Sequence, residues 1–220
     1  MDHESARNAF AHIEHIRTRL AKASTRVSDE FNGDAKDLAP SRPPTPAAVL
    51  VPLVLRDEAP SVLLTRRTDH LHHHPGQISF PGGRVEADDR SAVHTALRET
   101  EEEIGLASRH VELIGALPDY LTGTGFRVTP VVGLVRPPFD LRLDAFEVAE
   151  AFEVPLAHFL DARNHQEHSI MHEGRLRRFH AMPYHGYFIW GATAGIIMSL
   201  YRLSTTSVEQ PGSMRAQTPV

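Results

Sequence analysis

Apolar residues follow helical and strand periods along most of the chain. They recur every three or four positions through residues 5–24, at Phe10, Ile13, Ile16 and Leu20, which is typical of an amphipathic helix. Residues 91–104 show a similar spacing, with Ser91 or Asp89 as the N-cap and Gly105 as the closing residue. Residues 189–203 are apolar on most sides and predict a buried C-terminal helix.

Shorter apolar runs between these helices predict strands. They lie at residues 47–55, 61–66, 77–80, 111–117, 128–135, 152–155 and 177–185, with a helical turn at 156–160. Pro52 interrupts the first run, which predicts an edge strand or a bulge there. This order of elements predicts a mixed β-sheet with helices on both sides, in the α/β class and of the α+β type.

Polar and proline-rich stretches divide the chain into four parts. Residues 1–25 form an N-terminal helical extension, packed on the domain or available to a partner, and the favoured interpretation is packing. A proline-rich linker, 26–46, precedes the main domain at 47–203. The polar tail, 204–220, is predicted to be loose.

Composition excludes several classes of protein. The 220 residues are 41% hydrophobic and 23% charged, which is ordinary for a globular protein. The chain has no cysteine, so disulfides, thiolate zinc sites and cysteine nucleophiles are excluded. A net charge of -5 disfavours nucleic acid as a partner. The absence of a secretory signal and of a long apolar span predicts a cytoplasmic protein without a membrane partner.

The most informative stretch is a run of glutamates at residues 99–103. On a helix, Glu99, Glu102 and Glu103 share one face, opposite the apolar or small residues Val93, Ala96, Leu97, Thr100 and Ile104. Like charges at this spacing repel, and the C-terminal end of a helix dipole also disfavours them. A bound cation would reverse both effects, and carboxylate oxygens suit Mg²⁺ or Mn²⁺. A solvated acidic face is the alternative, and Glu101 is expected to be solvated in either case.

The residues around this run resemble the Nudix box. The second half reads Arg98-Glu99-Thr100-Glu101-Glu102-Glu103-Ile104-Gly105-Leu106, with Thr100 where an aliphatic residue or alanine is common. The first half fits after one extra residue is allowed, which places Gly83 and Asp89 at the glycine and first carboxylate of the box. The box binds divalent cations and hydrolyses nucleoside diphosphates linked to another group. The resemblance therefore implies a Nudix hydrolase domain over residues 47–203.

The segment upstream is similar to the branch of the family that hydrolyses coenzyme A. It reads Leu63-Leu64-Thr65-Arg66-Arg67-Thr68-Asp69-His70-Leu71-His72-His73-His74-Pro75-Gly76-Gln77-Ile78-Ser79-Phe80-Pro81-Gly82-Gly83. His72 departs from the arginine usual at its position, which could make binding depend on pH. The histidine-rich run could bind Zn²⁺ adventitiously, but a loop beside the substrate is the favoured interpretation.

The resemblance implies a set of site residues. The expected metal ligands are Glu99, Glu102 and Glu103, and the expected catalytic residues are Glu99, Glu102 and Arg98, which can hold Glu102. The substrate-binding candidates are Arg67, His72, Gly82 and Gly83. Arg67 is a phosphate clamp or a surface arginine, with equal weight. The general base remains open among Glu99, Glu102 and two loop residues, Glu147 and Glu150. Trp190 could stack on adenine, but a core position is favoured.

Together these features predict a metal-dependent coenzyme A diphosphatase. Its products would be 3′,5′-ADP and 4′-phosphopantetheine, or the acyl form of the latter. One alternative is the same chemistry on ADP-ribose, NADH or a nucleoside triphosphate. Another is a non-catalytic module that binds a nucleotide or a protein, ranked lowest because all three ligand glutamates are present. The N-terminal helix could mediate a homodimer.

Overall fold

The fold is given by a computed structural model that describes residues 3–23, 32–33, 43–71, 74–172 and 175–205. In chain order the helices are α1 (His3–Ala23), α2 (Ala92–Ile104), η1 (Ser108–His110), α3 (Leu156–Leu160), η2 (Ala162–Asn164) and α4 (Gly191–Thr205). The strands are β1 (Asn32–Gly33), β2 (Thr45–Leu55), β3 (Pro60–Arg67), β4 (Ile78–Ser79), β5 (Gly82–Arg84), β6 (Val111–Ala116), β7 (Tyr120–Leu121), β8 (Phe126–Val135), β9 (Val148–Pro155), β10 (Gln166–His172), β11 (Arg175–Tyr184) and β12 (Tyr187–Trp190).

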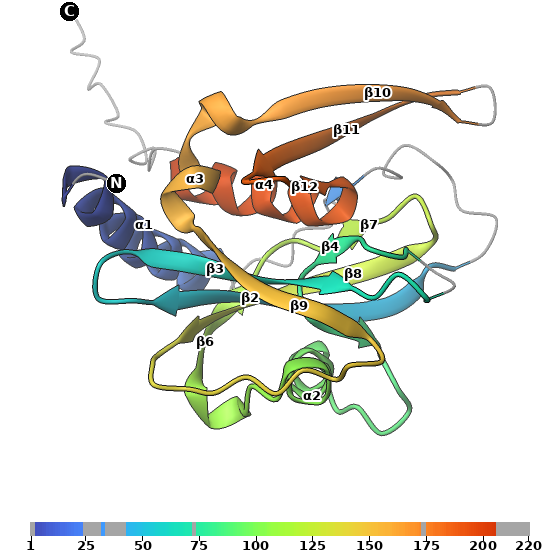
Figure 1. The fold of residues 1–220 in the computed structure, drawn as a ribbon, viewed down its shortest axis with the longest axis horizontal. Helices are drawn as coiled ribbons and strands as arrows, with labels where there is room; N and C mark the ends of the chain where they lie inside the picture. The colour runs from blue at the N-terminus through green and yellow to red at the C-terminus, as the bar shows by residue number, and fades with distance from the viewer. Residues whose placement is uncertain (1–2, 24–31, 34–42, 72–73, 173–174, 206–220) are drawn as a thin grey trace, which may run out of the picture.

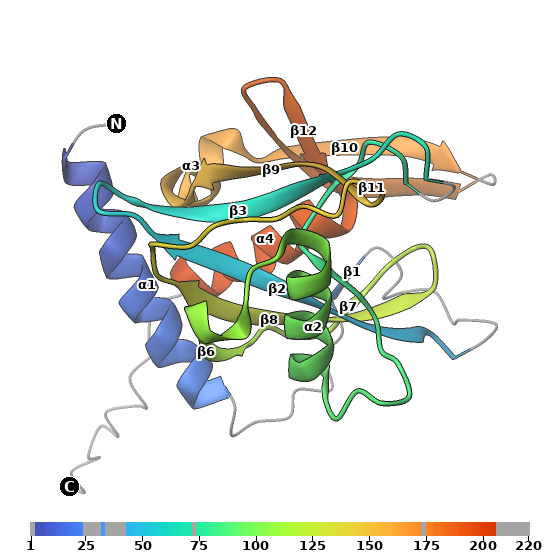
Figure 2. The ribbon, with the colours of Figure 1, turned by 60° about the horizontal axis from the view of Figure 1, so that its bottom comes forward.

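A mixed sheet forms the centre of the molecule. Its main path is β1-β7-β8-β2-β3-β4, with β5, β6 and β9 paired to strands of that path. β2 runs parallel to β8 and antiparallel to β3 and β5. Helix α2 covers one face, while α1 and α4 cover the other (Figures 1 and 2). The prediction of a mixed sheet between helices is therefore confirmed.

Each face of the sheet has its own apolar core. On the α2 side the buried residues include Leu50, Leu63, Ala96, Ile104 and Val131. On the opposite side the core includes Val51, Leu64, Ile16, Val132 and Ile197. Neighbouring residues of β2, β3 and β8 thus alternate between two buried faces, which explains why these strands read as continuous apolar runs.

The prediction of an edge strand or bulge at Pro52 is wrong. β2 is a central strand, and Pro52 lies in register with Gly133 of β8. The N–H of Leu50 points away from β8 and donates to Pro81 O, so the nitrogen of Pro52, two residues later, faces the same way. The ladder to β5 ends at Val49 and the ladder to β3 begins at Leu53. Pro52 therefore occupies a gap where no strand needs its missing donor.

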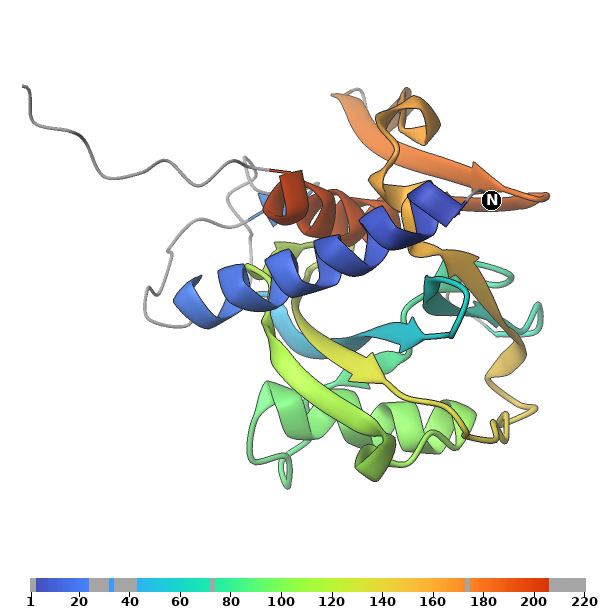
Figure 3. The ribbon, with the colours of Figure 1, turned by 90° about the vertical axis from the view of Figure 1, so that its left-hand side faces the viewer.

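Helix α1 packs along the face of the sheet that also carries α4 (Figure 3). Ile13, Ile16 and Leu20 are buried in the core on that side, as their spacing predicted. Arg17 Nη1 also forms an ion pair with Glu112 Oε1 of β6 at 2.5 Å. Of the two arrangements considered for this helix, the structure shows the packed one.

The C-terminal segment differs from the prediction of a helix over residues 189–203. Ile189 and Trp190 end strand β12, and α4 begins only at Gly191, which has a positive φ of 63°. Ile189 is buried, but Trp190 is 40% exposed, so the core position favoured for Trp190 is wrong. The reason is that β12 alternates its side chains between the core and the outer face of a second sheet, β10-β11-β12.

Several expectations lie outside the described residues. These are His72, most of the proline-rich linker and the tail from residue 206. Within the expected linker, β1 pairs with β7 and β2 already begins at Thr45. Among the described helices, none is long and apolar enough to cross a membrane.

Candidate metal-dependent hydrolase site

Helix α2 begins and ends where the sequence predicted. Ser91 is the N-cap, and its Oγ accepts a hydrogen bond from His94 N at 3.2 Å. Gly105 ends the helix with a left-handed φ of 69°, and its N–H donates to Glu101 O at 2.9 Å. The carbonyls of Glu103 and Ile104 accept from the backbone of the loop before β9. Both ends of the helix are therefore fixed to the domain.

Asp89 is nearly buried and gathers five donors. Its side chain is 1% exposed, and Arg98 donates to it through Nη2 at 2.9 Å and Nε at 3.1 Å. Glu86 N and Thr95 Oγ1 also donate at 2.9 Å, while His94 Nδ1 lies at 2.8 Å. These partners, Arg98 foremost, hold the pKa of Asp89 far below its usual range. The first carboxylate of the box therefore positions Arg98.

Arg98 in turn holds two of the expected metal ligands. Its Nη1 lies 2.9 Å from Glu102 Oε2 and 3.0 Å from Glu99 Oε1. The ion pair between Arg98 and Glu102, predicted from their four-residue spacing, is thus present. Because one nitrogen contacts both glutamates, the carboxylates of Glu99 and Glu102 lie close together beside the guanidinium of Arg98.

Glu99 fills the space that Gly83 leaves open. A Cβ at position 83 would collide with the carboxylate of Glu99. Burial raises the pKa of Glu99, and the positive charge of Arg98 opposes that shift. Gly83 is therefore needed at this point of β5 for a close approach by the acid.

Glu103 is the most buried acid of the helix, with a side chain 7% exposed. Gly82 N donates to its Oε2 at 3.2 Å, and Arg67 Nη1 lies 3.9 Å from its Oε1. Burial raises its pKa to about 8, against the opposing effects of these two partners. The three expected metal ligands differ in exposure, because β5 covers Glu103 while Glu102 stays in solvent.

Glu147 and Glu150 are both expected in a loop, but only Glu147 lies in the loop before β9, and Glu150 lies within β9. Glu147 approaches this group of carboxylates and Glu150 does not. Arg67 Nη2 lies 4.0 Å from Glu147 Oε2, and the charge of Glu147 raises the pKa of both Glu99 and Glu103. Glu150 instead contacts Arg66 Nε at 3.3 Å and accepts from Tyr187 Oη at 2.6 Å.

Arg66 and Arg67 point to different sides of the sheet. Arg67 contacts the acids of the α2 side, whereas Arg66 contacts Glu150, which also accepts from the phenol of Tyr187 in β12. Arg67, considered as a phosphate clamp or a surface arginine, lies beside Glu103 and Glu147 with a side chain 27% exposed.

A model of the NUDIX domain matches residues 44–173. The chain belongs to the Nudix family. This match covers both the helix of glutamates and the segment that supplies Arg67, Gly82 and Gly83.

Two bacterial relatives also support the family. One is named "Uncharacterized Nudix hydrolase NudL" in Enterobacter sp. (strain 638), 45% identical over 154 residues, or 70% of this chain and 80% of the relative. A protein of the same name in Escherichia coli (strain K12) is 46% identical over the same shares. The crystal structure of the Nudix hydrolase RenU from M. Smegmatis aligns with a TM-score of 0.45 at 20% identity, covering 59% of this chain and 81% of that one. The predicted family is confirmed, while none of these names specifies coenzyme A.

The Nudix residues of this chain fit a divalent cation by their chemistry. Glu99, Glu102, Glu103 and Glu147 offer only hard oxygen donors, which suit Mg²⁺ or Mn²⁺. Burial raises the pKa values of Glu99 and Glu103, and a cation bound beside them would favour their charged forms. In the described part of the chain, no three acidic, histidine or cysteine side chains already converge as a metal site.

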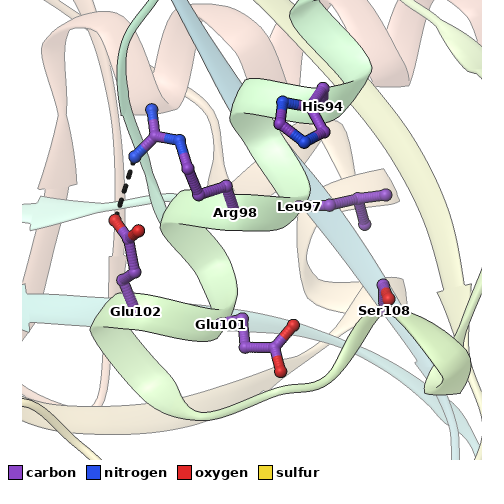
Figure 4. Close-up of a pocket in the computed structure, with 6 residues that line it drawn as sticks. All are labelled: His94, Leu97, Arg98, Glu101, Glu102 and Ser108. Carbon is purple, nitrogen blue, oxygen red and sulfur yellow. Dashed lines mark hydrogen bonds and ion pairs between the residues drawn. The ribbon is translucent and has the colours of Figure 1, made fainter. Parts of the chain in front are cut away.

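A separate open pocket lies on the outer side of α2. It is lined by His94, Leu97, Arg98, Glu101, Glu102 and Ser108 (Figure 4). Arg98 reaches Glu102 at one side, while Glu101 is exposed and turns toward Ser108, as expected for a solvated residue. The deeper acids Glu99 and Glu103 are not part of its lining.

Sequence reasoning missed two features of the site. It left the role of Asp89 open, because the extra residue before the helix obscured its place in the box. It also missed Thr68, whose N–H and Oγ1 bind the loop that carries Glu147. The threonine had no local signal, because its partners are distant in sequence.

Proposed function

We propose that this Nudix protein hydrolyses the diphosphate of coenzyme A, or of its derivatives, to 3′,5′-ADP and 4′-phosphopantetheine or its acyl form. The observation that carries the proposal is the contact between Arg67 and Glu103. It joins the segment that resembles the coenzyme A branch to the helix of glutamates, so that a phosphate-binding group and the metal-binding acids meet.

The chain supplies carboxylates, a guanidinium and two backbone glycines for binding the cation and the diphosphate. Glu99, Glu102 and Glu103 would hold Mg²⁺ or Mn²⁺, with Asp89 and Arg98 orienting Glu99 and Glu102. The cation would neutralise the diphosphate and make a nearby water easier to deprotonate. Arg67 would bind a phosphate oxygen through its fork of donors. Gly82 holds Glu103 through its backbone N–H, and Gly83 leaves room for Glu99.

Attack of water on phosphorus also needs a proton acceptor. Glu147 is supported over Glu150, because it lies beside Arg67 while Glu150 is occupied by Arg66 and Tyr187. Glu99 and Glu102 remain alternatives on the helix.

Product analysis by mass spectrometry tests the proposal. The purified protein is incubated with coenzyme A and Mg²⁺ or Mn²⁺, beside ADP-ribose, NADH and dGTP. Fastest release of 3′,5′-ADP and 4′-phosphopantetheine, abolished by EDTA, is expected. Faster cleavage of another substrate would overturn the coenzyme A assignment while keeping the hydrolase. Absence of cleavage with either metal would favour a non-catalytic binding module.

A further inference from the structure

An exposed pair of rings lies next to the acidic site. The side chain of Phe146 belongs to the loop before β9, in a residue that is 64% exposed. The imidazole of His70 lies against it, with ring centroids 4.9 Å apart and planes tilted by 59°. Neither ring has a part in binding the metal or the diphosphate as described above.

The backbone under Phe146 is held firmly. Its N–H donates to Asp144 Oδ1 at 2.9 Å, and its carbonyl accepts from Thr68 Oγ1 at 2.7 Å. The next carbonyl, of Glu147, accepts from Thr68 N at 3.0 Å. Asp144 N in turn donates to Glu103 O at 2.9 Å, which ties the loop to the end of α2. Figure 1 shows this loop passing beside α2. The ring is therefore exposed on a fixed support.

The position of the pair is set by the same contacts. Thr68 follows Arg67, and Phe146 precedes Glu147, so each ring belongs to a segment that also supplies a charged residue of the site. Phe146 is the immediate neighbour of Glu147, whose Oε2 lies 4.0 Å from Arg67 Nη2. A group bound on the rings would thus lie beside a diphosphate bound at Arg67.

We propose that His70 and Phe146 form a platform on which the purine base of the nucleotide substrate stacks. The inference rests on the proposed function, because it places the base relative to a diphosphate at Arg67. Stacking the apolar π-face of a base on an exposed ring removes both from water and is favourable, and such stacking tolerates different bases. The platform accounts for an apolar ring that is held in solvent beside a charged site.

A second group of exposed rings provides a matched control. Phe188 is 45% exposed and Trp190 is 40% exposed on the sheet of β10, β11 and β12. Phe188 contacts His168 with centroids 5.8 Å apart, so it too is an exposed phenylalanine beside a histidine. It has no contact with Arg67, Glu103 or Glu147 among the interactions of the described residues.

Ligand binding by NMR titration tests the platform without requiring turnover. AMP and ribose 5-phosphate are titrated, with Mg²⁺ present, into the full-length native protein and the variants Phe146→Ala, Phe146→Trp, His70→Ala and Phe188→Ala. We expect Phe146→Ala to weaken AMP binding about tenfold and to leave ribose 5-phosphate within twofold. Phe146→Trp should restore AMP binding, and His70→Ala should weaken it less than Phe146→Ala does. Phe188→Ala should match the native protein.

The outcomes separate the two proposals. Equal affinity of the native protein for AMP and ribose 5-phosphate would overturn the platform, as would native AMP binding by both Phe146→Ala and His70→Ala. If diphosphates are cleaved but AMP binding ignores Phe146, the platform fails and the proposed function stands. If no diphosphate is cleaved but AMP binding depends on Phe146, the hydrolase assignment fails and the base-binding platform stands.

Discussion

Asp89 and Arg98 form a paired carboxylate and guanidinium with contacts of 2.9 and 3.1 Å, on a carboxylate that is nearly closed to solvent. The same guanidinium contacts Glu99 and Glu102 through Nη1. Asp89 therefore acts on the metal-binding acids through Arg98, in the way that an outer partner orients a ligand.

Replacing Asp89 by asparagine should release Arg98 from this geometry. We expect kcat to fall roughly 10- to 100-fold, since partners of metal ligands have effects of this size. The melting temperature should also fall, because Arg98 loses its main charge partner. Steady-state kinetics on the diphosphate substrate measures kcat, and thermal unfolding measures the melting temperature. Asp88→Asn, at the exposed neighbouring position, is the control. Equal activity of the two variants would show that Asp89 has no positioning role.

Gly82 and Gly83 should respond to alanine in different ways. At Gly83 the new Cβ meets the flexible carboxylate of Glu99, so the fold should persist while the acid is displaced. We expect an unchanged melting temperature without metal and a Mg²⁺ affinity lower by about tenfold.

At Gly82 the φ is 153° and the new Cβ would meet the backbone of Ala48 and Val49. The fold itself should then lose stability, by about 1–3 kcal/mol or more, because the backbone cannot move as a side chain can. Thermal unfolding of both variants, with and without Mg²⁺, distinguishes these effects. A fully stable Gly82→Ala would contradict the close packing of β5 on β2.

The sequence predicts local features of this fold, such as helix ends, better than it predicts the directions in which the acidic side chains point. Helix α2 and its caps are read from Ser91 and Gly105, because capping depends on a few neighbouring residues. The sides of the sheet on which Glu147 and Glu150 lie could not be predicted from neighbouring residues. β9 pairs Glu150 with Arg66 but Val148 with Arg67, so a bulge breaks the two-residue alternation at this point. The burial of Glu103 likewise depends on β5, a strand of three residues.

The buried acid Glu103 should make metal-free stability depend on pH. Its pKa is about 8 in the folded protein and 4.5 for an unperturbed glutamate. Between these values the folded state binds more protons than the unfolded state, so the free energy of unfolding should fall as pH rises from about 4.5 to about 8. The loss is on the order of a few kcal/mol. Mg²⁺ should offset it, since binding to the folded state alone raises stability.

Melting temperatures in EDTA and in Mg²⁺ at pH 5, 6.5 and 8 measure this effect. Glu103→Gln should flatten the metal-free decline and lose most of the response to Mg²⁺. Glu101→Gln is the matched control, as an exposed glutamate two positions away on the same helix. A native protein and a Glu103→Gln variant with parallel pH profiles would contradict the raised pKa.

A comparison of Glu147 with Glu150 gives the most direct test of the site. Glu147 lies beside Arg67 and raises the pKa of the helix acids, while Glu150 is joined to Arg66 and Tyr187. We therefore expect Glu147→Gln to lower kcat by about 100-fold or more if it accepts the proton, with KM changed much less. Glu150→Gln should keep kcat within about threefold of the native protein. Both variants remove one negative charge, at positions three residues apart, so Glu150→Gln controls for the loss of charge in Glu147→Gln. If Glu150→Gln were the impaired variant, the proton acceptor would lie on the other face of the sheet, and the arrangement of Arg67, Glu103 and Glu147 would not be the reactive one.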